Sequence, residues 1–293
     1  MKPLPFKIPK TEATSFRIQV DEGPHFYDRL HYHPEWQLTA IQQGSGMLFL
    51  GNSFIRFQEG SVFLVGSNVP HLLKNDAVYF SENSPGVRAT SIFFHKKSFG
   101  EGFFELPELL EIQQLLEASE RGIWVLGEEK KKLSAQIESC LLMSGIDLFQ
   151  NFLSLLGILC QTKTIQYLNE ATFKPVFEEK DGQRLDHVFQ YSFQHFAESI
   201  ELAEVAAIAN LSVSQFCRYF KLHTRKTYFG YLNELRIEAA CKLLSEGKYS
   251  IAQVCYEVGF NNLSNFNRQF RKLKGMTPSE FRKAFEFEKS FFE

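Results

Sequence analysis

A repeated eight-residue pattern near the end of the 293-residue chain constrains its fold more than any other feature. Residues 214–221 read SQFCRYFK and residues 264–271 read SNFNRQFR, so that a serine, two phenylalanines, an arginine and a closing basic residue recur at the same places. In both copies the phenylalanines lie four residues apart, a spacing that puts them on one face of a helix. The repeat therefore predicts two copies of one helical unit.

Each copy follows a short apolar segment and a break in the helical pattern. The segments are Leu202–Ala209 (LAEVAAIA) and Ile251–Val258 (IAQVCYEV). Gly259 begins the second break, where a left-handed turn residue is expected between two helices. We predict two helix-turn-helix units, whose second helices, Ser212–Leu222 and Leu263–Lys274, carry polar outer faces. We name these the first and the second reading helix.

Basic residues gather at the ends of the two reading helices. The overall charge of −2 by itself argues against a nucleic-acid partner. Residues 185–293, however, carry 14 Lys and Arg against 12 Asp and Glu, whereas residues 1–184 carry 18 against 22. Arg218–Lys226 contains four basic residues and no acid, and Arg268–Lys283 contains six basic residues and one acid. Local charge of this kind is expected where phosphates lie.

Other positions around the two units extend the pattern. They are Ile251-Ala252, Gly259-Phe260, Gly275-x-Thr277-Pro278, Phe281-Arg282 and, in the helix predicted between the units, Arg236-x-x-x-Ala240-x-x-Leu243-Leu244. Together with the repeat, they make the segment from about Leu185 to Phe285 resemble the DNA-binding domain of the AraC/XylS family of transcription regulators. Glu201, where the family often has a Ser or Thr cap, and Cys255, where a small Ala is usual, depart from the family pattern. The resemblance implies a sequence-specific regulator of transcription that binds double-stranded DNA.

The outward-facing polar residues of the two reading helices are the candidate DNA contacts. They are Ser212, Ser214, Gln215, Cys217, Arg218 and Lys221 in the first unit, and Asn262, Ser264, Asn265, Asn267, Arg268, Arg271 and Lys272 in the second. Arg218 and Arg268 could be solvated surface charges, but their recurrence at matching positions favours contact with DNA. Lys272 and Lys274 are expected to contact phosphates.

The first half of the chain has a different pattern. Between Ser15 and His95, short apolar runs (WQLTAIQQ, GMLFLGN, FIRFQEGSVFLVG and ATSIFFH) alternate with Gly, Asn and Pro breaks, which predicts an all-β barrel or sandwich. From about Leu106 to Leu168, apolar residues at three- and four-residue steps predict helices, which could cap the barrel or bury apolar surface against a second subunit in a homodimer. Residues 169–184 lose this periodicity and gain charge, Pro and Gly, and we interpret them as a linker.

A group of histidines marks a candidate ligand site in the β region. The stretches HYHPE at 31–35 and GSVFLVGSNVPH at 60–71 resemble the two motifs of a cupin barrel. In metal-binding cupins such positions supply the metal ligands; here they are His31, His33, Glu35 and His71. Glu35 follows His33 more closely than the metal-binding pattern usually has it, and regulators of the AraC/XylS family often keep such a barrel as a metal-free pocket. Both uses stay open: a metal site, or a pocket in which these four residues and Trp36 bind an organic effector.

Cysteine spacing and hydropathy argue against other classes of protein. The five cysteines, at 140, 160, 217, 241 and 255, form no Cys-x-x-Cys pair and no zinc-finger spacing, which is typical of reduced cytoplasmic thiols. The opening MKPLPFKIPK lacks the apolar stretch of a secretory signal. Residues 140–160 suggest a membrane span, but a polar stripe at helical spacing favours a packed amphipathic helix. We expect a cytoplasmic protein without membrane contact.

The sequence thus predicts an α+β chain of two domains. Residues 1–168 form a cupin-like β-barrel followed by helices, which senses a ligand and contributes to dimerisation, and residues 185–293 form an all-α DNA-binding domain with two helix-turn-helix units. We expect a regulator with no enzymatic activity and no cofactor, whose partners are double-stranded DNA, a small-molecule effector, a second copy of the chain and RNA polymerase. The alternative is a cupin metalloenzyme fused to a DNA-binding module. An RNA-binding or purely structural helical protein explains neither the doubled unit nor its arginines.

Overall fold

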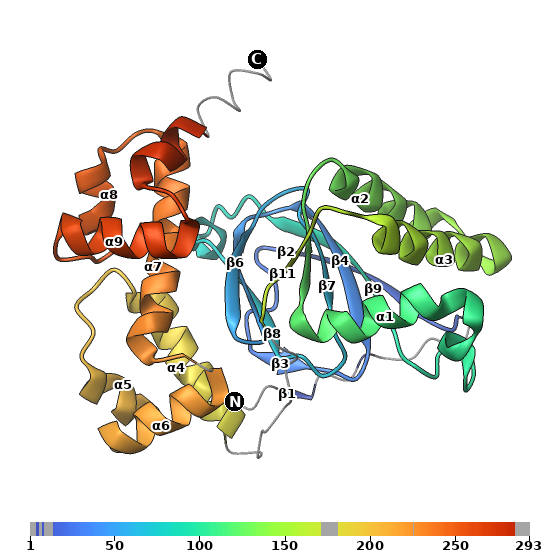
Figure 1. Ribbon diagram of the computed structural model, residues 1–293, viewed down its shortest axis with the longest axis horizontal. Coiled ribbons are helices and arrows are strands. Elements are labelled where there is room, and N and C mark those ends of the chain that lie inside the picture. Colours follow the sequence, from blue (N-terminus) through green and yellow to red (C-terminus); the bar gives the residue numbers. More distant parts are fainter. Residues whose placement is uncertain (1–3, 6–7, 9–13, 171–180, 225, 285–293) are drawn as a thin grey trace. The chain divides into compact units, whose positions relative to one another are not determined.

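The computed structural model describes residues 4–5, 8, 14–170, 181–224 and 226–284. It divides into two compact units, Met1–Gly182 and Gln183–Glu293. The predicted order, a β-rich half followed by a helical half, is confirmed (Figure 1).

The first unit contains two β-sheets. The five-stranded sheet has the order β1 (Leu4–Pro5), β3 (His31–Tyr32), β8 (His71–Asn75), β5 (Gly46–Leu50) and β6 (Ser53–Phe57). The six-stranded sheet has the order β11 (Ile165–Tyr167), β10 (Ile123–Val125), β7 (Val62–Val65), β4 (Trp36–Gln43), β9 (Val87–Phe94) and β2 (Arg17–Gly23). The predicted apolar runs are therefore strands, as expected. Within the described residues they form two open sheets and do not close into one barrel.

Alternation along β4 gives the six-stranded sheet one apolar and one polar face. Leu38 and Ala40 belong to the apolar cluster beneath the helices. Gln37 and Thr39 point the other way and line a cavity together with histidines of the five-stranded sheet. Successive side chains of a strand lie on opposite faces, so this one strand supplies both the core and the polar site.

Three helices cover the outer face of the six-stranded sheet. They are α1 (Leu110–Ala118), α2 (Glu129–Ser139) and α3 (Gly145–Gln161), drawn in green in Figure 1. Their buried residues share one cluster with Leu38 and Ile92 of the sheet. The first unit also contains short 3₁₀ helices: η1 (Ala77–Phe80), η2 (Phe103–Glu105), η3 (Pro107–Leu109), η4 (Ser119–Arg121) and η5 (Cys140–Leu142). Among the described residues, no helix is both long and apolar enough to cross a bilayer.

Residues 106–168 are not entirely helical, which corrects the sequence-based expectation. Ile123, Trp124 and Val125 form β10, which pairs with β7 on one side and with β11 on the other. These are β-branched and aromatic residues, and pairing with an existing strand edge favours the extended backbone over the helical periodicity of the flanking segments.

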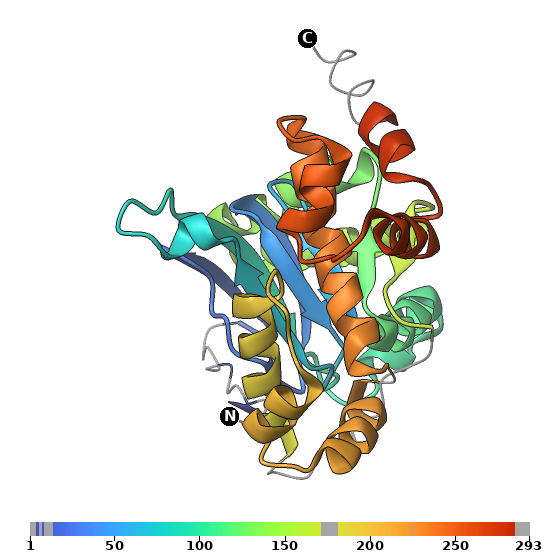
Figure 2. The same cartoon turned by 90° about the vertical axis from the view of Figure 1, so that its left-hand side faces the viewer.

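The second unit is helical and contains the two predicted helix-turn-helix units. Its helices include α4 (Asp181–His195), α5 (Leu202–Ile208), α6 (Val213–Thr224), α7 (Tyr228–Glu246), α8 (Ile251–Glu257) and α9 (Leu263–Lys274). The first reading helix is α6 and the second is α9. Figure 2 shows α7, in orange, running between the pair α5–α6 and the pair α8–α9.

Both helix-turn-helix units turn through a residue with left-handed backbone. Asn210 has a φ of 53° and Gly259 has a φ of 84°. At Gly259 a Cβ atom would also lie 2.8 Å from the carbonyl oxygens of Phe196 and Ala197, so that only glycine fits there. The predicted turn at Gly259 is confirmed.

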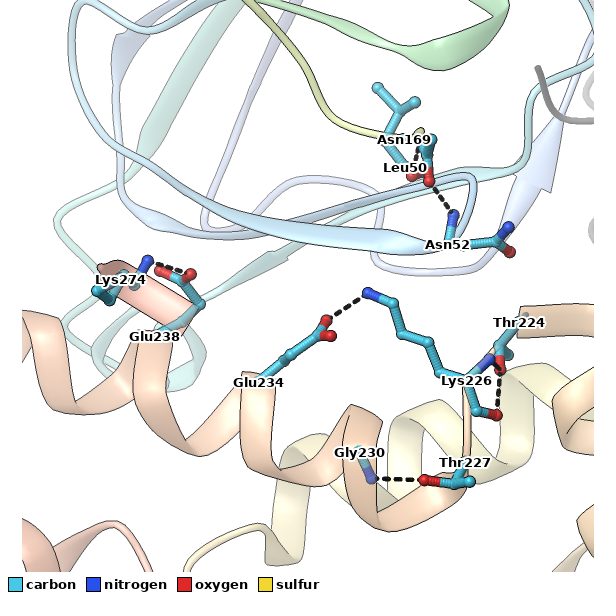
Figure 3. A network of polar contacts seen from close by, with 10 residues as sticks. All are labelled: Leu50, Asn52, Asn169, Thr224, Lys226, Thr227, Gly230, Glu234, Glu238 and Lys274. Carbon is cyan, nitrogen blue, oxygen red and sulfur yellow. Dashed lines mark hydrogen bonds and ion pairs between the residues drawn. The ribbon is translucent and has the colours of Figure 1, made fainter. Parts of the chain in front are cut away.

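The predicted linker, residues 169–184, falls mostly on residues 171–180, which lie outside the described part of the chain. At its start, Asn169 is tied into the first unit. Its side-chain amide donates to the carbonyl oxygen of Leu50 (3.1 Å), and its Oδ1 accepts from the backbone N–H of Asn52 (2.9 Å; Figure 3). At its end, α4 begins at Asp181.

Candidate DNA interface and effector cavity

The two reading helices begin at side-chain caps. The Oδ1 atom of Asn262 accepts from the backbone N–H of Asn265 (2.8 Å) at the start of α9. At the start of α6, the Oε1 atom of Gln215 accepts from the backbone N–H of Ser212 (3.1 Å), the residue before the helix, and from the Ser212 hydroxyl (2.9 Å). Three of the predicted DNA contacts, Ser212, Gln215 and Asn262, therefore take part in capping their own helices.

The reading helices are amphipathic in the predicted direction. Phe216, Phe220, Phe266 and Phe270 are fully buried. The candidate DNA contacts listed from the sequence are all exposed apart from Asn265, which is half-buried. The guanidinium of Arg268 donates to Oδ1 of Asn265 (2.9 Å), so these two side chains act as a pair. Each helix thus presents an arginine at the matching place of an exposed polar face.

Lys274 differs from its neighbours at the end of α9. Arg271 and Lys272 are exposed. The ammonium of Lys274 instead forms an ion pair with the carboxylate of Glu238 on α7, and the two side chains are only 24% and 13% exposed (Figure 3). The structure therefore gives Lys274 a partner within the protein, where the sequence had suggested a phosphate contact.

The histidines predicted as a ligand site lie together inside the first unit. His31 on β3 and His71 on β8 are register partners, and their ring centroids are 4.2 Å apart. The ring of His33 lies 5.1 Å from that of His71. One ring nitrogen from each of the three histidines lies within 4.8 Å of the others. The juxtaposition follows from strand pairing, because β3 and β8 are separated by 38 residues of sequence but adjacent in the sheet.

Backbone carbonyls orient all three imidazoles. The Nδ1 atoms of His31, His33 and His71 lie 2.8 Å, 3.0 Å and 2.9 Å from the carbonyl oxygens of Arg29, Glu35 and Val69, respectively. A carbonyl oxygen only accepts, so Nδ1 carries the proton in each ring and donates it. Burial lowers the pKa of His31 to about 4, and burial also lowers the pKa values of His33 and His71. The rings are therefore neutral near pH 7, and each keeps a lone pair on Nε2.

Gln37 connects His33 and His71. Its Oε1 atom lies 3.1 Å and 2.9 Å from their Nε2 atoms, and its amide nitrogen lies 3.0 Å from Oγ1 of Thr39 and 3.3 Å from Oγ of Ser91. With Oε1 in this place, each neutral imidazole would face an acceptor at both nitrogens. A half-turn of the amide removes this conflict: the NH₂ group then donates to both Nε2 atoms, and the oxygen accepts from one of the two hydroxyls, which in turn accepts from the other across the 2.8 Å contact between Thr39 and Ser91. The five side chains then form a neutral network.

This network lines a cavity of about 70 Å³ between the two sheets. Its wall includes Gln19 and Asp21 of β2, and burial raises the pKa of the Asp21 carboxyl. Phe26 and Phe93 supply the apolar part of the wall. A larger cavity of about 430 Å³ shares Ile8 and Phe93 with the first and also contacts Arg17, Glu35 and Lys97. Sequence reasoning missed Gln19, Asp21, Gln37 and Ser91; the only local signal for Gln37 is its place two residues before Thr39 on the polar face of β4.

Trp36 and Glu35 both lie outside the wall of the small histidine cavity. Trp36 lies on the opposite face of β4 from Gln37 and packs against Phe94 and Phe104. Glu35 lies on the Nδ1 side of His33, at 3.7 Å, and lines the larger cavity. Its Oε2 atom is buried and has no hydrogen-bond partner among the described residues.

A metal ion would be held by the three histidines without Glu35. The convergent ring nitrogens belong to His31, His33 and His71, and Glu35 is outside that group. A carbonyl on Nδ1 is also the arrangement that orients metal-binding histidines. In the described structure, however, the Gln37 amide lies against two of the three Nε2 atoms. A metal ion would have to displace this amide or bind it through its oxygen.

Comparisons with known proteins match both units. An AraC-like ligand-binding domain model matches residues 13–144, and a helix-turn-helix domain model matches residues 205–284. The uncharacterized HTH-type transcriptional regulator YdeC of Bacillus subtilis is 24% identical over 92% of this chain and 90% of its own. The HTH-type transcriptional activator RhaS of Pectobacterium carotovorum is 24% identical over 86% of each chain. Among solved structures, ToxT from Vibrio cholerae is 14% identical, with a TM-score of 0.36 over 93% of this chain and 100% of that chain.

The matched domains agree with the features found in each unit. The ligand-binding model covers the strands that hold the histidine cavity, and the helix-turn-helix model runs from α5 to beyond α9, across both reading helices. The protein belongs to the AraC family of DNA-binding transcription regulators, with a ligand-binding domain ahead of its helix-turn-helix domain.

Proposed function

We propose that the histidine cavity binds a small hydroxylated effector, and that binding there changes how the second unit reads DNA. The observation that carries the proposal is that neutral His31, His33 and His71 converge in a polar cavity, where Gln37 contacts His33 and His71. Buried polar groups are costly unless they are hydrogen-bonded, and hydroxyl groups can both donate to and accept from such a set. In this proposal, residues 1–168 bind the effector, residues 169–184 link the two domains, and residues 185–293 bind DNA.

The charge and size of the cavities restrict the effector. Depressed histidine pKa values and the raised pKa of Asp21 reflect a site that disfavours charge, which favours a neutral polyhydroxylated molecule over an ion. A cavity of about 70 Å³ accepts a few water-sized groups, whereas the neighbouring cavity of about 430 Å³ is within the usual range for ligand pockets. We therefore place the hydroxyl-bearing end of the effector among the histidines and the rest of it in the larger cavity.

The DNA-binding half of the proposal rests on the exposed faces of α6 and α9. Arg218 and Arg268 are proposed to contact base edges, with the other exposed polar residues of the two helices beside them. Two helix-turn-helix units on one face of the duplex would enter major-groove segments about one turn, or roughly 10 bp, apart.

A second copy of the chain is the proposed partner of the first unit. Leu142 at the end of η5 is 92% exposed and Ile146 near the start of α3 is 66% exposed. Adjoining apolar side chains of this kind favour burial against another subunit. Contact with RNA polymerase is proposed as the further step by which bound regulator alters transcription.

The histidine cluster also supports the alternative of a cupin metalloenzyme. Three converging, carbonyl-oriented histidines are a suitable donor set for a divalent transition metal. This alternative predicts stoichiometric metal in the purified protein, loss of that metal in His71→Ala, and turnover of a small substrate. Elemental analysis therefore separates it from the effector proposal.

The test of the effector proposal is a thermal-shift screen of neutral metabolites on the full chain, read by tryptophan fluorescence. Both tryptophans, Trp36 and Trp124, lie in the first unit, so the signal reports that unit. A true effector should stabilise the wild type, lose its effect in His71→Ala and Gln37→Leu, and keep it in the control His25→Ala, because His25 is exposed and outside the cavity. It should also change the affinity of the full chain for DNA selected from a random pool. A compound that stabilises the unit yet leaves DNA affinity unchanged would contradict the proposal.

A further inference from the structure

The helix α7 carries two acidic residues that each hold one helix-turn-helix unit. Glu234 and Glu238 are four residues apart, so they lie on one face of the helix. The carboxylate of Glu234 lies 2.5 Å from the ammonium of Lys226. The carboxylate of Glu238 forms an ion pair with the ammonium of Lys274 (Figure 3). We propose that these two ion pairs form a clamp that fixes the spacing of the two reading helices, and hence the half-site spacing that the protein accepts on DNA.

Each lysine of the clamp stands at the C-terminal end of a reading helix. Lys274 is the last residue of α9. Lys226 follows the end of α6, and its backbone N–H donates to Oγ1 of Thr224, the last residue of that helix (3.3 Å). Thr227 then caps α7 by accepting from the N–H of Gly230 (3.1 Å). The two lysines therefore connect the ends of α6 and α9 to neighbouring turns of one rigid helix.

Both ion pairs of the clamp are partly buried. Lys226 and Glu234 are 27% and 22% exposed, and Lys274 and Glu238 are less exposed on average. A half-buried ion pair is screened less than a surface pair, and removal of one partner leaves the other charge without compensation. Apolar packing already holds α9 against α7, through Phe266 and Phe270 against Ile237 and Cys241. Hydrophobic burial by itself is not directional, so we infer that the ion pair adds a directional restraint on α9 at its C-terminal end.

The clamp predicts a dependence on DNA spacing that a purely stabilising ion pair would lack. One inserted base pair moves a half-site by about 3.4 Å and rotates it by roughly 35°. A protein with rigidly held reading helices cannot follow both half-sites after this change. The inference rests on the proposed two-site reading of DNA.

The experiment uses the full chain and the DNA motif that it selects from a random pool. Affinity is measured for the selected spacing and for spacings changed by one base pair in either direction. The wild type should lose at least about tenfold on the altered spacings. In Glu238→Gln this penalty should fall to roughly threefold or less, with weaker binding at the selected spacing. The charge-exchanged double variant Glu238→Lys/Lys274→Glu should restore the penalty, and Glu257→Gln, which removes one negative charge at an exposed position of α8, should keep it.

Any one of three results would overturn the clamp. If Lys274 contacts phosphate, Glu238→Gln frees it, and binding to all DNA should tighten with a salt dependence steeper by about one unit. An unchanged spacing penalty in Glu238→Gln would likewise refute it. If no DNA motif is selected, the proposed reading of DNA fails. The clamp is then tested by amide hydrogen exchange, because Glu238→Gln should speed exchange in α9 more than in α6. Equal exchange of α9 in wild type and variant would refute the clamp without reference to DNA.

Discussion

Acidification should destabilise the first unit through the histidines of its cavity. The folded pKa of His31 is lowered by burial from 6.5 to about 4. The unfolded chain therefore binds a proton as the pH falls through 6.5, while the folded chain does not until about pH 4. The stability that His31 contributes is complete above pH 6.5 and is lost between these two values. From the two pKa values, the loss is about 2 kcal/mol at pH 5 and about 3 kcal/mol at its limit. The lowered pKa values of His33 and His71 act in the same direction.

Urea unfolding at pH 7.5 and pH 5, followed by tryptophan fluorescence, measures this loss. His31→Asn removes the titrating group. Between pH 7.5 and pH 5 the variant should therefore lose about 2 kcal/mol less of its free energy of unfolding than the wild type loses. His25→Asn, a change at an exposed histidine of the same unit, controls for the loss of a histidine as such. Equal pH dependence in His31→Asn and wild type would refute the assignment of a neutral, desolvated His31.

The other predictions concern the linker anchor, the reading helices and the apolar surface. Asn169→Ala should destabilise the first unit by roughly 2–4 kcal/mol in the same unfolding assay, because it removes the hydrogen bonds to the carbonyl of Leu50 and from the N–H of Asn52; a loss below about 0.5 kcal/mol, the level of an ordinary surface substitution, would contradict it. Arg268→Ala should cost on the order of 1–3 kcal/mol on selected DNA and relax base preference, whereas Lys272→Ala should weaken all DNA alike; equal losses on selected and random DNA would assign Arg268 to phosphates. Leu142→Asp with Ile146→Asp should shift the chain toward monomer in sedimentation, and an unchanged mass would place any dimer contact elsewhere.

The helical half could be predicted from the sequence because its determinants are local. The phenylalanine spacing, the caps and Gly259 each act within a few residues, and the repeat places them twice. Even there the sequence did not reveal the partner of Lys274. Glu238 is 36 residues away from it, on another helix, and only the packing of α9 on α7 brings the two charges together.

The cavity could be predicted only in part. The histidines stood out because His-x-His would place two rings on one side of a strand; β3 does pair His31 with His71, and His33 directly follows β3. Gln37, Ser91 and Asp21 come from three different strands of the other sheet, and no local pattern shows which sheet faces which. Trp36 was assigned to the pocket because it neighbours the histidines in sequence. One residue along a strand reverses the face, so Trp36 packs beneath the helices and Gln37 enters the cavity.

Asn169 shows how the cavity and the start of the predicted linker are connected through the backbone of the first unit. Leu50 is the register partner of His71 in the pairing of β5 with β8. The carbonyl of the same Leu50 accepts from the amide of Asn169, whose own carbonyl accepts from the guanidinium of Arg121 (2.9 Å). A displacement of β8 by a bound effector would therefore reach Asn169 through one strand pair and one hydrogen bond. Composition alone marks Asn169 as the first residue of a polar connecting segment, since its partners lie 119 and 48 residues away in sequence. Those distant contacts make it an anchor from which movement in the β-sheet can be passed to the residues that follow.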